Sequence, residues 1–152
     1  MTVIFLDIDG VFCTLRSHYA YNNNELLEPW DPTCCQMIRR LCLKYDLKIV
    51  CSSSWRNDPK CKSFFEKYEL LEFLHDDWRT KDILRAECRG QEVAEWLTRH
   101  TDVSYIIIDD DSDFLKDQLP FFVKTAGYDG FSAHNYQQVE DIVKQYLAKL
   151  PD

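Results

Sequence analysis

Short apolar runs divide the chain and predict buried β-strands. Three of them cover residues 3–6, 47–51 and 103–108, and a fourth covers residues 121–125. Within each run the apolar residues are mostly consecutive rather than alternating with polar ones, which is typical of strands buried on both faces of a parallel sheet. We therefore expect these four segments to form the sheet.

Apolar residues recur at helical spacing between and after these runs. Helices are predicted over residues 32–44, 59–74, 91–100 and 135–150. Asp31 is a plausible N-cap for the first of these helices, and Asn135 could cap the last. Strands that alternate with helices indicate an α/β fold with a mainly parallel sheet and right-handed crossovers, in three layers ordered α/β/α.

Residues 13–30 match neither the strand period nor the helix period and are rich in Asn, Tyr and Ser. We interpret them as a flap, a long loop inserted after the first strand; loops of this length often serve as lids. Aromatic residues in or beside it, such as Trp30, more often pack a loop down than stack on a substrate ring. With 152 residues, the chain fits a single domain over 1–152.

The net charge of −8 and the pI near 4.9 restrict the partners of the protein. Broad, non-specific binding to nucleic acid depends on many Lys and Arg side chains that displace counterions, so this composition disfavours it. An acidic chain also repels a phosphorylated substrate unless a bound cation reverses the local field. A metal ion is therefore expected on electrostatic grounds.

Seven cysteines form no C-x-x-C pair and are odd in number, which fits neither a disulfide framework nor a usual zinc site. We interpret them as reduced thiols. The apolar run before the first acid is too short for a signal peptide or a membrane anchor. These features predict a cytoplasmic protein with no membrane partner.

Polar side chains follow the predicted strands, at the edge where open parallel sheets gather their working groups. The first strand is followed by Asp7, Asp9 and Gly10, the second by residues 52–56 and the third by residues 109–113. A single acidic cluster at a strand end is more often a solvated loop. Two such clusters on one predicted edge, with hydroxyl groups between them, favour a functional site.

Asp7 and Asp9 are two residues apart, so in extended backbone their side chains point the same way, and Gly10 allows a sharp turn after them. The acids after the third strand would add repulsion to this pocket. A hard cation among the carboxylates would relieve that repulsion, and oxygen ligands of this kind suit Mg²⁺.

These motifs resemble those of the haloacid dehalogenase-like (HAD) phosphatases. Residues 5–11 are similar to the first motif, hhhhDxDG, the serine after the second strand is similar to the second motif, and residues 106–110 are similar to the acidic fourth motif. More narrowly, residues 51–56, 89–97 and 108–113 resemble a compact branch without a cap domain that also occurs in multidomain RNA-repair proteins. The resemblance implies a Rossmann-like HAD fold and a phosphoric monoester hydrolase.

The resemblance also implies a role for each residue of the acidic motifs. Asp7 would attack phosphorus and form an aspartyl-phosphate, and Asp9 would act as the general acid and base. Mg²⁺ would be held by Asp7, by the backbone carbonyl of Asp9 and by Asp109 or Asp110. Asp113 is a possible supporting ligand.

Phosphate binding is assigned to Ser53, with Ser52 as the alternative, although either serine could instead cap the next segment. Arg89 is the expected cation of the third motif. Its rivals for the phosphate are Lys81, Lys124 and Arg56. Arg56 and Gly10 complete the predicted substrate-binding set. No ligand is assigned after the fourth run, where Lys124 and Thr125 stand in place of an acid.

Other interpretations fit less well. The segment from Cys51 to Arg56 is C-x₄-R, one residue shorter than the C-x₅-R loop of cysteine phosphatases. A receiver domain would need a single Asp, then Thr, then Lys on successive strands, which does not match. A non-catalytic module that binds a phospho-ligand or a partner remains the alternative. The substrate stays open among a nucleic-acid 3′-phosphate, a nucleotide, a sugar phosphate and a phosphoprotein.

Overall fold

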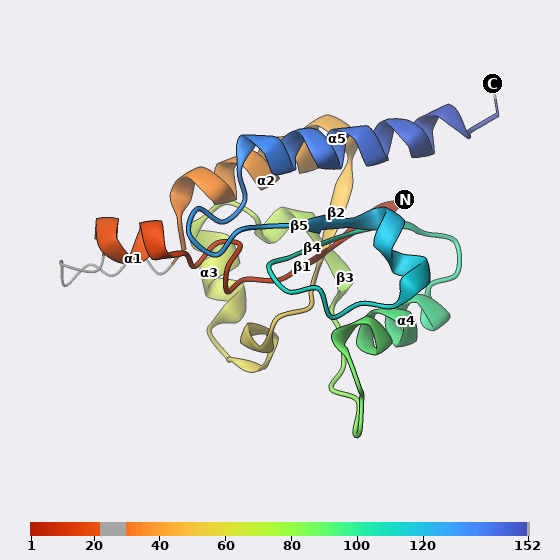
Figure 1. The fold of residues 1–152 in the computed structure, drawn as a ribbon, viewed down its shortest axis with the longest axis horizontal. Coiled ribbons are helices and arrows are strands. Elements are labelled where there is room, and N and C mark those ends of the chain that lie inside the picture. The colour runs from red at the N-terminus through yellow and green to blue at the C-terminus, as the bar shows by residue number, and fades with distance from the viewer. Residues whose placement is uncertain (22–29, 152) are drawn as a thin grey trace.

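The computed structural model describes residues 1–21 and 30–151 and contains a five-stranded sheet (Figure 1). The strands are β1 (Thr2–Leu6), β2 (Leu47–Cys51), β3 (Leu74–Arg79), β4 (Ser104–Asp109) and β5 (Phe122–Lys124). Their order is β3-β2-β1-β4-β5, and every neighbouring pair is parallel. The sheet therefore confirms the predicted α/β class.

Helices cover both faces of the sheet, with α2 and α5 on one face and α4 on the other (Figure 1). The helices are α1 (Leu15–Tyr21), α2 (Pro32–Tyr45), α3 (Cys61–Lys67), α4 (Arg89–Arg99) and α5 (Ala133–Ala148), with short 3₁₀ turns η1 (Ser54–Asn57), η2 (Leu71–Phe73) and η3 (Lys116–Phe121). The predicted three-layer architecture is confirmed, and the part of the chain that the structure describes includes no cap domain.

The central strand β1 shows why the core has two halves. Its side chains alternate, so Ile4 and Leu6 join the cluster under α2, α3 and α5, whereas Val3 and Phe5 face α4. The rings of Phe5 and Trp96 meet edge to face with centroids 5.2 Å apart. Burial on both sides explains why the sequence of this strand is continuously apolar.

Four strands and three helices lie close to the predicted positions. Asp31 caps α2, as expected, and its carboxylate accepts a hydrogen bond from the Thr33 backbone N–H at 2.9 Å. The predicted caps and starts of the later helices need correction. Ser132, and not Asn135, is the N-cap of α5, with Asn135 as the third residue of the capping box, and α4 begins two residues before the predicted start.

The single helix predicted over residues 59–74 is wrong. Helix α3 ends at Lys67, the backbone of Glu69 takes a left-handed φ of 61°, and the chain then forms η2 and the edge strand β3. A left-handed residue cannot continue an α-helix. The strand was missed because its sequence is largely polar, and an edge strand has only one paired neighbour and is only partly buried.

The loop predicted over residues 13–30 is wrong over its first part, where Leu15–Tyr21 form α1. Thr14 and Ser17 exchange hydrogen bonds between backbone N–H and hydroxyl at 2.9 and 3.0 Å, which stabilises the start of this helix. Arg16 forms an ion pair with Asp31 at 2.7 Å. The rest of the predicted flap, residues 22–29, lies outside the described residues.

The register of the sheet aligns the polar strand ends. Leu6 pairs with Cys51 on one side and with Ile108 on the other. The residues that follow these three are Asp7, Ser52 and Asp109, so they emerge side by side at the carboxyl edge. None of the helices formed by the described residues is long and apolar enough to cross a membrane.

Candidate active site

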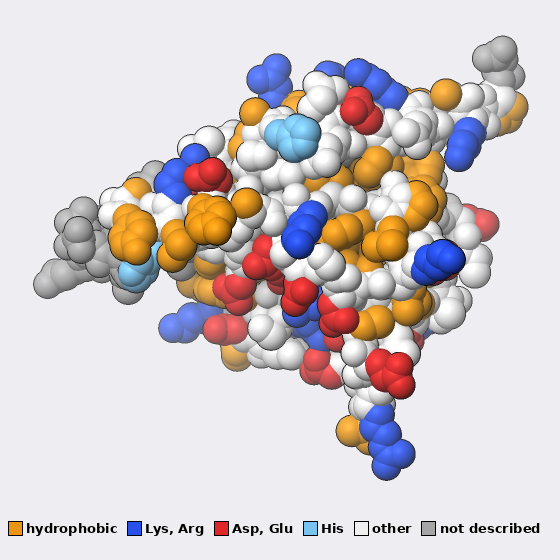
Figure 2. Space-filling view, viewed as in Figure 1, with side chains coloured by type: hydrophobic (Ala, Val, Ile, Leu, Met, Phe, Trp, Pro, Cys, Tyr) orange, Lys and Arg blue, Asp and Glu red, His pale blue; other side chains and the backbone are white. Residues whose placement is uncertain are grey.

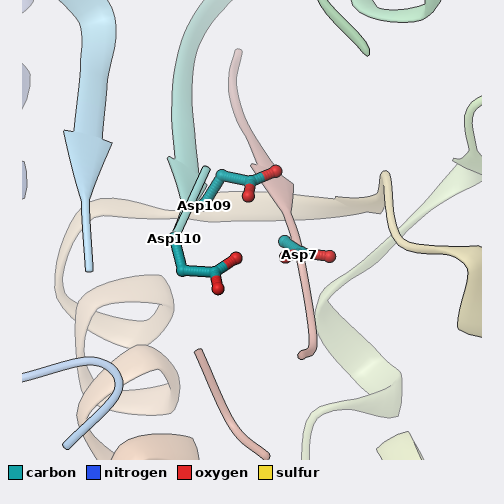
Figure 3. Close-up of side chains that lie close together, drawn as sticks. All are labelled: Asp7, Asp109 and Asp110. Carbon is teal, nitrogen blue, oxygen red and sulfur yellow. The ribbon is translucent and has the colours of Figure 1, made fainter. Parts of the chain in front are cut away.

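Three carboxylates converge at the carboxyl edge of the central strands (Figure 3). Asp7 follows β1, Asp109 ends β4 and Asp110 follows it, and one oxygen from each lies within 4.8 Å of the others. Asp7 and Asp109 are 4 % and 0 % exposed, so they are not solvated loop acids. In the view of Figure 2, acidic side chains gather near the middle of the molecular surface, over the loops that follow the central strands.

Burial and crowding disfavour the charged forms of the two buried acids. Burial raises the pKa of Asp7 to about 6, although the nearby Arg89 charge and a backbone hydrogen bond oppose the shift. Burial, and then the Asp7 charge, raise the pKa of Asp109 to about 8. Loss of water around the carboxylates is therefore the main reason that both pKa values rise, and a cation between the two groups would favour their ionised forms.

Gly10 is required by the position of Asp110. Its φ of 81° is left-handed, and a Cβ built there would lie 2.2 Å from Asp110 Oδ2 and 2.6 Å from Asp110 Cβ. Because the contact includes an atom next to the Asp110 backbone, rotation of the carboxylate alone would not relieve it. The Thr125 hydroxyl donates a hydrogen bond to the Gly10 carbonyl at 2.8 Å and fixes this turn from the β5 side.

Arg89, the first residue of α4, bridges the two buried acids. Its Nη1 donates to Asp7 Oδ1 at 3.0 Å and to Asp109 Oδ2 at 3.1 Å. Its backbone N–H donates to the Asp113 carboxylate at 3.1 Å, which places Asp113 at the start of α4 instead of in the three-carboxylate cluster. Over residues 1–21 and 30–151, neither Lys81 nor Lys124 forms an ion pair with these carboxylates.

The two candidate serines differ in their surroundings. Ser53 is the N-cap of η1, and its Oγ accepts a hydrogen bond from the Trp55 backbone N–H at 3.3 Å. The hydroxyl proton of Ser53 is not used in that bond and can still be donated. Ser52 is fully buried, and its Oγ has no hydrogen-bond partner among the described residues. Both serines follow β2, next to Asp7.

Arg56 is not placed with the carboxylate cluster, contrary to its predicted role in substrate binding. Its side chain is 4 % exposed, and Nη2 pairs with Asp82 at 2.5 Å and with Glu92 of α4 at 2.6 Å. Nη1 donates to the Ser52 carbonyl at 3.1 Å. Breaking a buried ion pair costs about 3–5 kcal/mol, so Arg56 is better assigned to holding α4 against the end of β2.

Asp9 is exposed, and its carboxylate is held by a tryptophan. The indole Nε1 of Trp55 donates to Asp9 Oδ1 at 3.0 Å. The ring of Trp55 packs against Trp30 and Phe64, with centroids 5.9 and 5.3 Å away. Sequence reasoning missed Trp55 and Thr125, because neither residue type suggests this chemistry unless its partner is known.

The residues at this edge fit a magnesium ion. Their donors are hard carboxylate oxygens at short mutual distances, which suit Mg²⁺ better than a soft metal. Asp7, Asp109 and Asp110 would hold the ion. The arrangement thus combines a candidate metal site, a cation that contacts two of its carboxylates, and hydroxyls from the neighbouring strand.

Comparison with known families gives one match. Residues 3–136 match the HAD domain in Swiss Army Knife RNA repair proteins, and this span includes nearly all of the sheet, helix α4 and the site. HAD proteins generally use Mg²⁺. No curated protein and no solved structure shows a significant match to the chain.

Proposed function

Because the chain belongs to the family of HAD domains found in Swiss Army Knife RNA repair proteins, we propose that it is a Mg²⁺-dependent phosphomonoester hydrolase that uses Asp7 as its nucleophile. The observation that carries this proposal is the convergence of Asp7, Asp109 and Asp110 within 4.8 Å. Arg89 supports it, since its guanidinium contacts the proposed nucleophile directly.

The reaction would proceed in two displacements at phosphorus. An Asp7 oxygen attacks in line, and the bond from phosphorus to the ester oxygen breaks while Asp9 gives that oxygen a proton. Asp9 then takes a proton from water, whose oxygen attacks the aspartyl-phosphate and releases inorganic phosphate and free Asp7. When bound, Mg²⁺ would supply positive charge that stabilises the phosphoryl oxygens in both displacements.

The other residues of the site would orient the phosphate. Arg89 contacts Asp7 and Asp109 at the start of α4, where it would face the equatorial phosphoryl oxygens. The free proton of the Ser53 hydroxyl would bind another oxygen, with Ser52 as the alternative. The backbone carbonyl of Asp9 would be a further ligand of the ion.

The substrate would be a phosphate monoester on a nucleic-acid 3′ end, a nucleotide or a phosphoprotein. The absence of a cap among the described residues favours a bulky or macromolecular substrate, and the match to a domain of RNA repair proteins favours a nucleic-acid end. The seven free cysteines fit a reducing compartment, and we place the protein in the cytoplasm as part of this proposal.

The test is turnover of purified protein with an aryl phosphate and with a 3′-phosphorylated oligonucleotide, each with Mg²⁺ or EDTA. We expect hydrolysis that requires Mg²⁺ and falls to background in Asp7→Asn. The matched control is Asp111→Asn, because this exposed acid is next to Asp110 but its carboxylate accepts from the Ser112 backbone N–H at 2.8 Å. We expect this control to keep wild-type turnover.

Undiminished hydrolysis by Asp7→Asn would remove Asp7 as the nucleophile. Failure of the wild-type protein to hydrolyse any phosphate monoester, together with binding of a phosphorylated ligand, would instead favour the alternative of a non-catalytic binding module.

A further inference from the structure

Trp55 has a fixed place beside the proposed general acid. It lies in the first turn of η1, which begins directly after Ser53. Its ring meets Trp30 at an interplanar angle of 68° and Phe64 at 80°, so two neighbouring rings limit its movement. Trp30 is fully buried and stacks on Tyr68 with centroids 5.5 Å apart. The indole is thus supported by the core.

The polar end of this ring points at one oxygen of Asp9. Its Nε1–H donates to Oδ1 at 3.0 Å, across 46 positions of sequence. An indole N–H can only donate, so it binds the bare oxygen of the carboxyl group and leaves the other oxygen for exchange of a proton. The Cys13 thiol also contacts Asp9, which lies two residues after Asp7.

We propose that Trp55 is the positioning residue of Asp9: it holds this exposed carboxyl group so that its second oxygen faces the ester oxygen of the substrate. The inference rests on the proposed function and goes further, because it assigns a role to a residue outside the acidic motifs. An exposed Asp side chain can exchange among its rotamers unless a fixed donor holds it. A hydrogen bond from a rigid, packed donor removes that freedom before the substrate binds.

The chemistry of the leaving group makes this role measurable. When Asp7 displaces an alkoxide from phosphorus, the breaking bond leaves a strongly basic oxygen that must take the Asp9 proton. When it displaces p-nitrophenoxide, the leaving oxygen is stable as an anion and needs little protonation. A misplaced Asp9 should therefore slow the first displacement far more for alkyl esters than for activated aryl esters.

The experiment compares wild type with Trp55→Phe, which keeps an aromatic ring and removes the N–H. We expect kcat/KM for an alkyl phosphate to fall by about 10–100-fold, the range for lost positioning of a catalytic group. With p-nitrophenyl phosphate we expect kcat/KM to stay within about threefold, since this leaving group depends little on the acid. The comparison uses kcat/KM because kcat also includes hydrolysis of the aspartyl-phosphate, in which Asp9 acts as the base whichever ester was cleaved.

Trp78→Phe is the matched control. Trp78 is a partly buried tryptophan of β3 that packs on Phe65 of the same core, with centroids 6.5 Å apart, and its ring also lies beside Lys62 and Arg79. The substitution removes the same atoms at a site where the indole does not bind Asp9. If Trp55→Phe does not fold, Trp55→Tyr, which also lacks the indole N–H, takes its place.

A double-mutant comparison separates positioning from general damage. In an Asp9→Asn background, Trp55→Phe should cause no further loss of alkyl phosphate turnover, because the group that it positions is gone. Equal losses of kcat/KM on the alkyl and aryl esters, a further loss in the Asp9→Asn background, or an unchanged kcat/KM of Trp55→Phe on the alkyl ester would each overturn the assignment. A wild-type protein inactive on both esters would overturn the proposed function, and the assignment with it.

Discussion

Raising the pH of the metal-free protein should weaken its fold. An unfolded Asp loses its proton near pH 4, whereas burial raises the pKa of Asp7 to about 6 and that of Asp109 to about 8 in the folded chain. Between about pH 4 and these values, the folded state therefore binds more protons than the unfolded state. The free energy of unfolding must then fall as the pH rises through this window.

The size of the effect follows from the separation of the folded and unfolded pKa values. One pH unit of separation corresponds to about 1.4 kcal/mol, so Asp7 alone contributes on the order of 3 kcal/mol between pH 4 and pH 6. Asp109 acts in the same direction up to about pH 8, but it is in contact with Asp7, so the two effects are not independent. For a chain of this size, about 3 kcal/mol is roughly 6–12 °C in Tm.

The assay is thermal unfolding between pH 4 and pH 8, with EDTA or with Mg²⁺. We expect Tm to fall with pH in EDTA, and Mg²⁺ to raise Tm more at pH 8 than at pH 5, because the ion binds the ionised carboxylates. Asp7→Asn should reduce the slope of the EDTA profile, since burial still raises the pKa of Asp109, and Asp111→Asn should leave the profile unchanged. A constant or rising Tm in EDTA, or equal stabilisation by Mg²⁺ at both pH values, would refute the reasoning.

Two further substitutions test the supports of the site. Gly10→Ala should lower the free energy of unfolding by about 1–2 kcal/mol for the left-handed backbone alone. It should also weaken Mg²⁺ binding, since its Cβ would displace Asp110; an unchanged Mg²⁺ titration would contradict this. Arg56→Gln leaves Glu92 partly buried without its partner and should destabilise the fold by about 3–5 kcal/mol. Adding Glu92→Gln should recover part of that loss in urea unfolding, whereas strictly additive losses would show that the pair does not interact.

The central strands could be predicted because burial on both faces leaves a clear mark on the sequence. β1 and β4 are largely apolar, and the parallel direction of the sheet followed from the alternation with helices. β3 has one free edge, so polar residues are tolerated and its pattern resembled the end of a helix. Helix α1 is short and exposes the ring of Tyr19, and its start depends on the Thr14 and Ser17 pair rather than on periodicity.

The grouping of the residues at the strand ends could be predicted from the parallel direction of the strands. Parallel strands in register bring the residues after Leu6 and Ile108 to one place, so neighbours could be inferred without coordinates. The pairings made by the 3₁₀ turn η1 could not be predicted in this way. The contacts of Arg56 with Glu92 of α4 and of Trp55 with Asp9 depend on how this short turn faces its neighbours, and no period in the sequence encodes that direction.

The charges at the carboxyl edge support a divalent ion more directly than composition does. Three carboxylates lie within 4.8 Å of one another, and one guanidinium, that of Arg89, contacts two of them. When all three acids are ionised, two negative charges are left over, which is the charge that one Mg²⁺ neutralises. Without such an ion the chain lowers the charge by retaining protons on its buried acids, and a protonated Asp7 is a poor nucleophile. The groups that destabilise the metal-free fold at neutral pH are therefore the ones on which the proposed reaction depends.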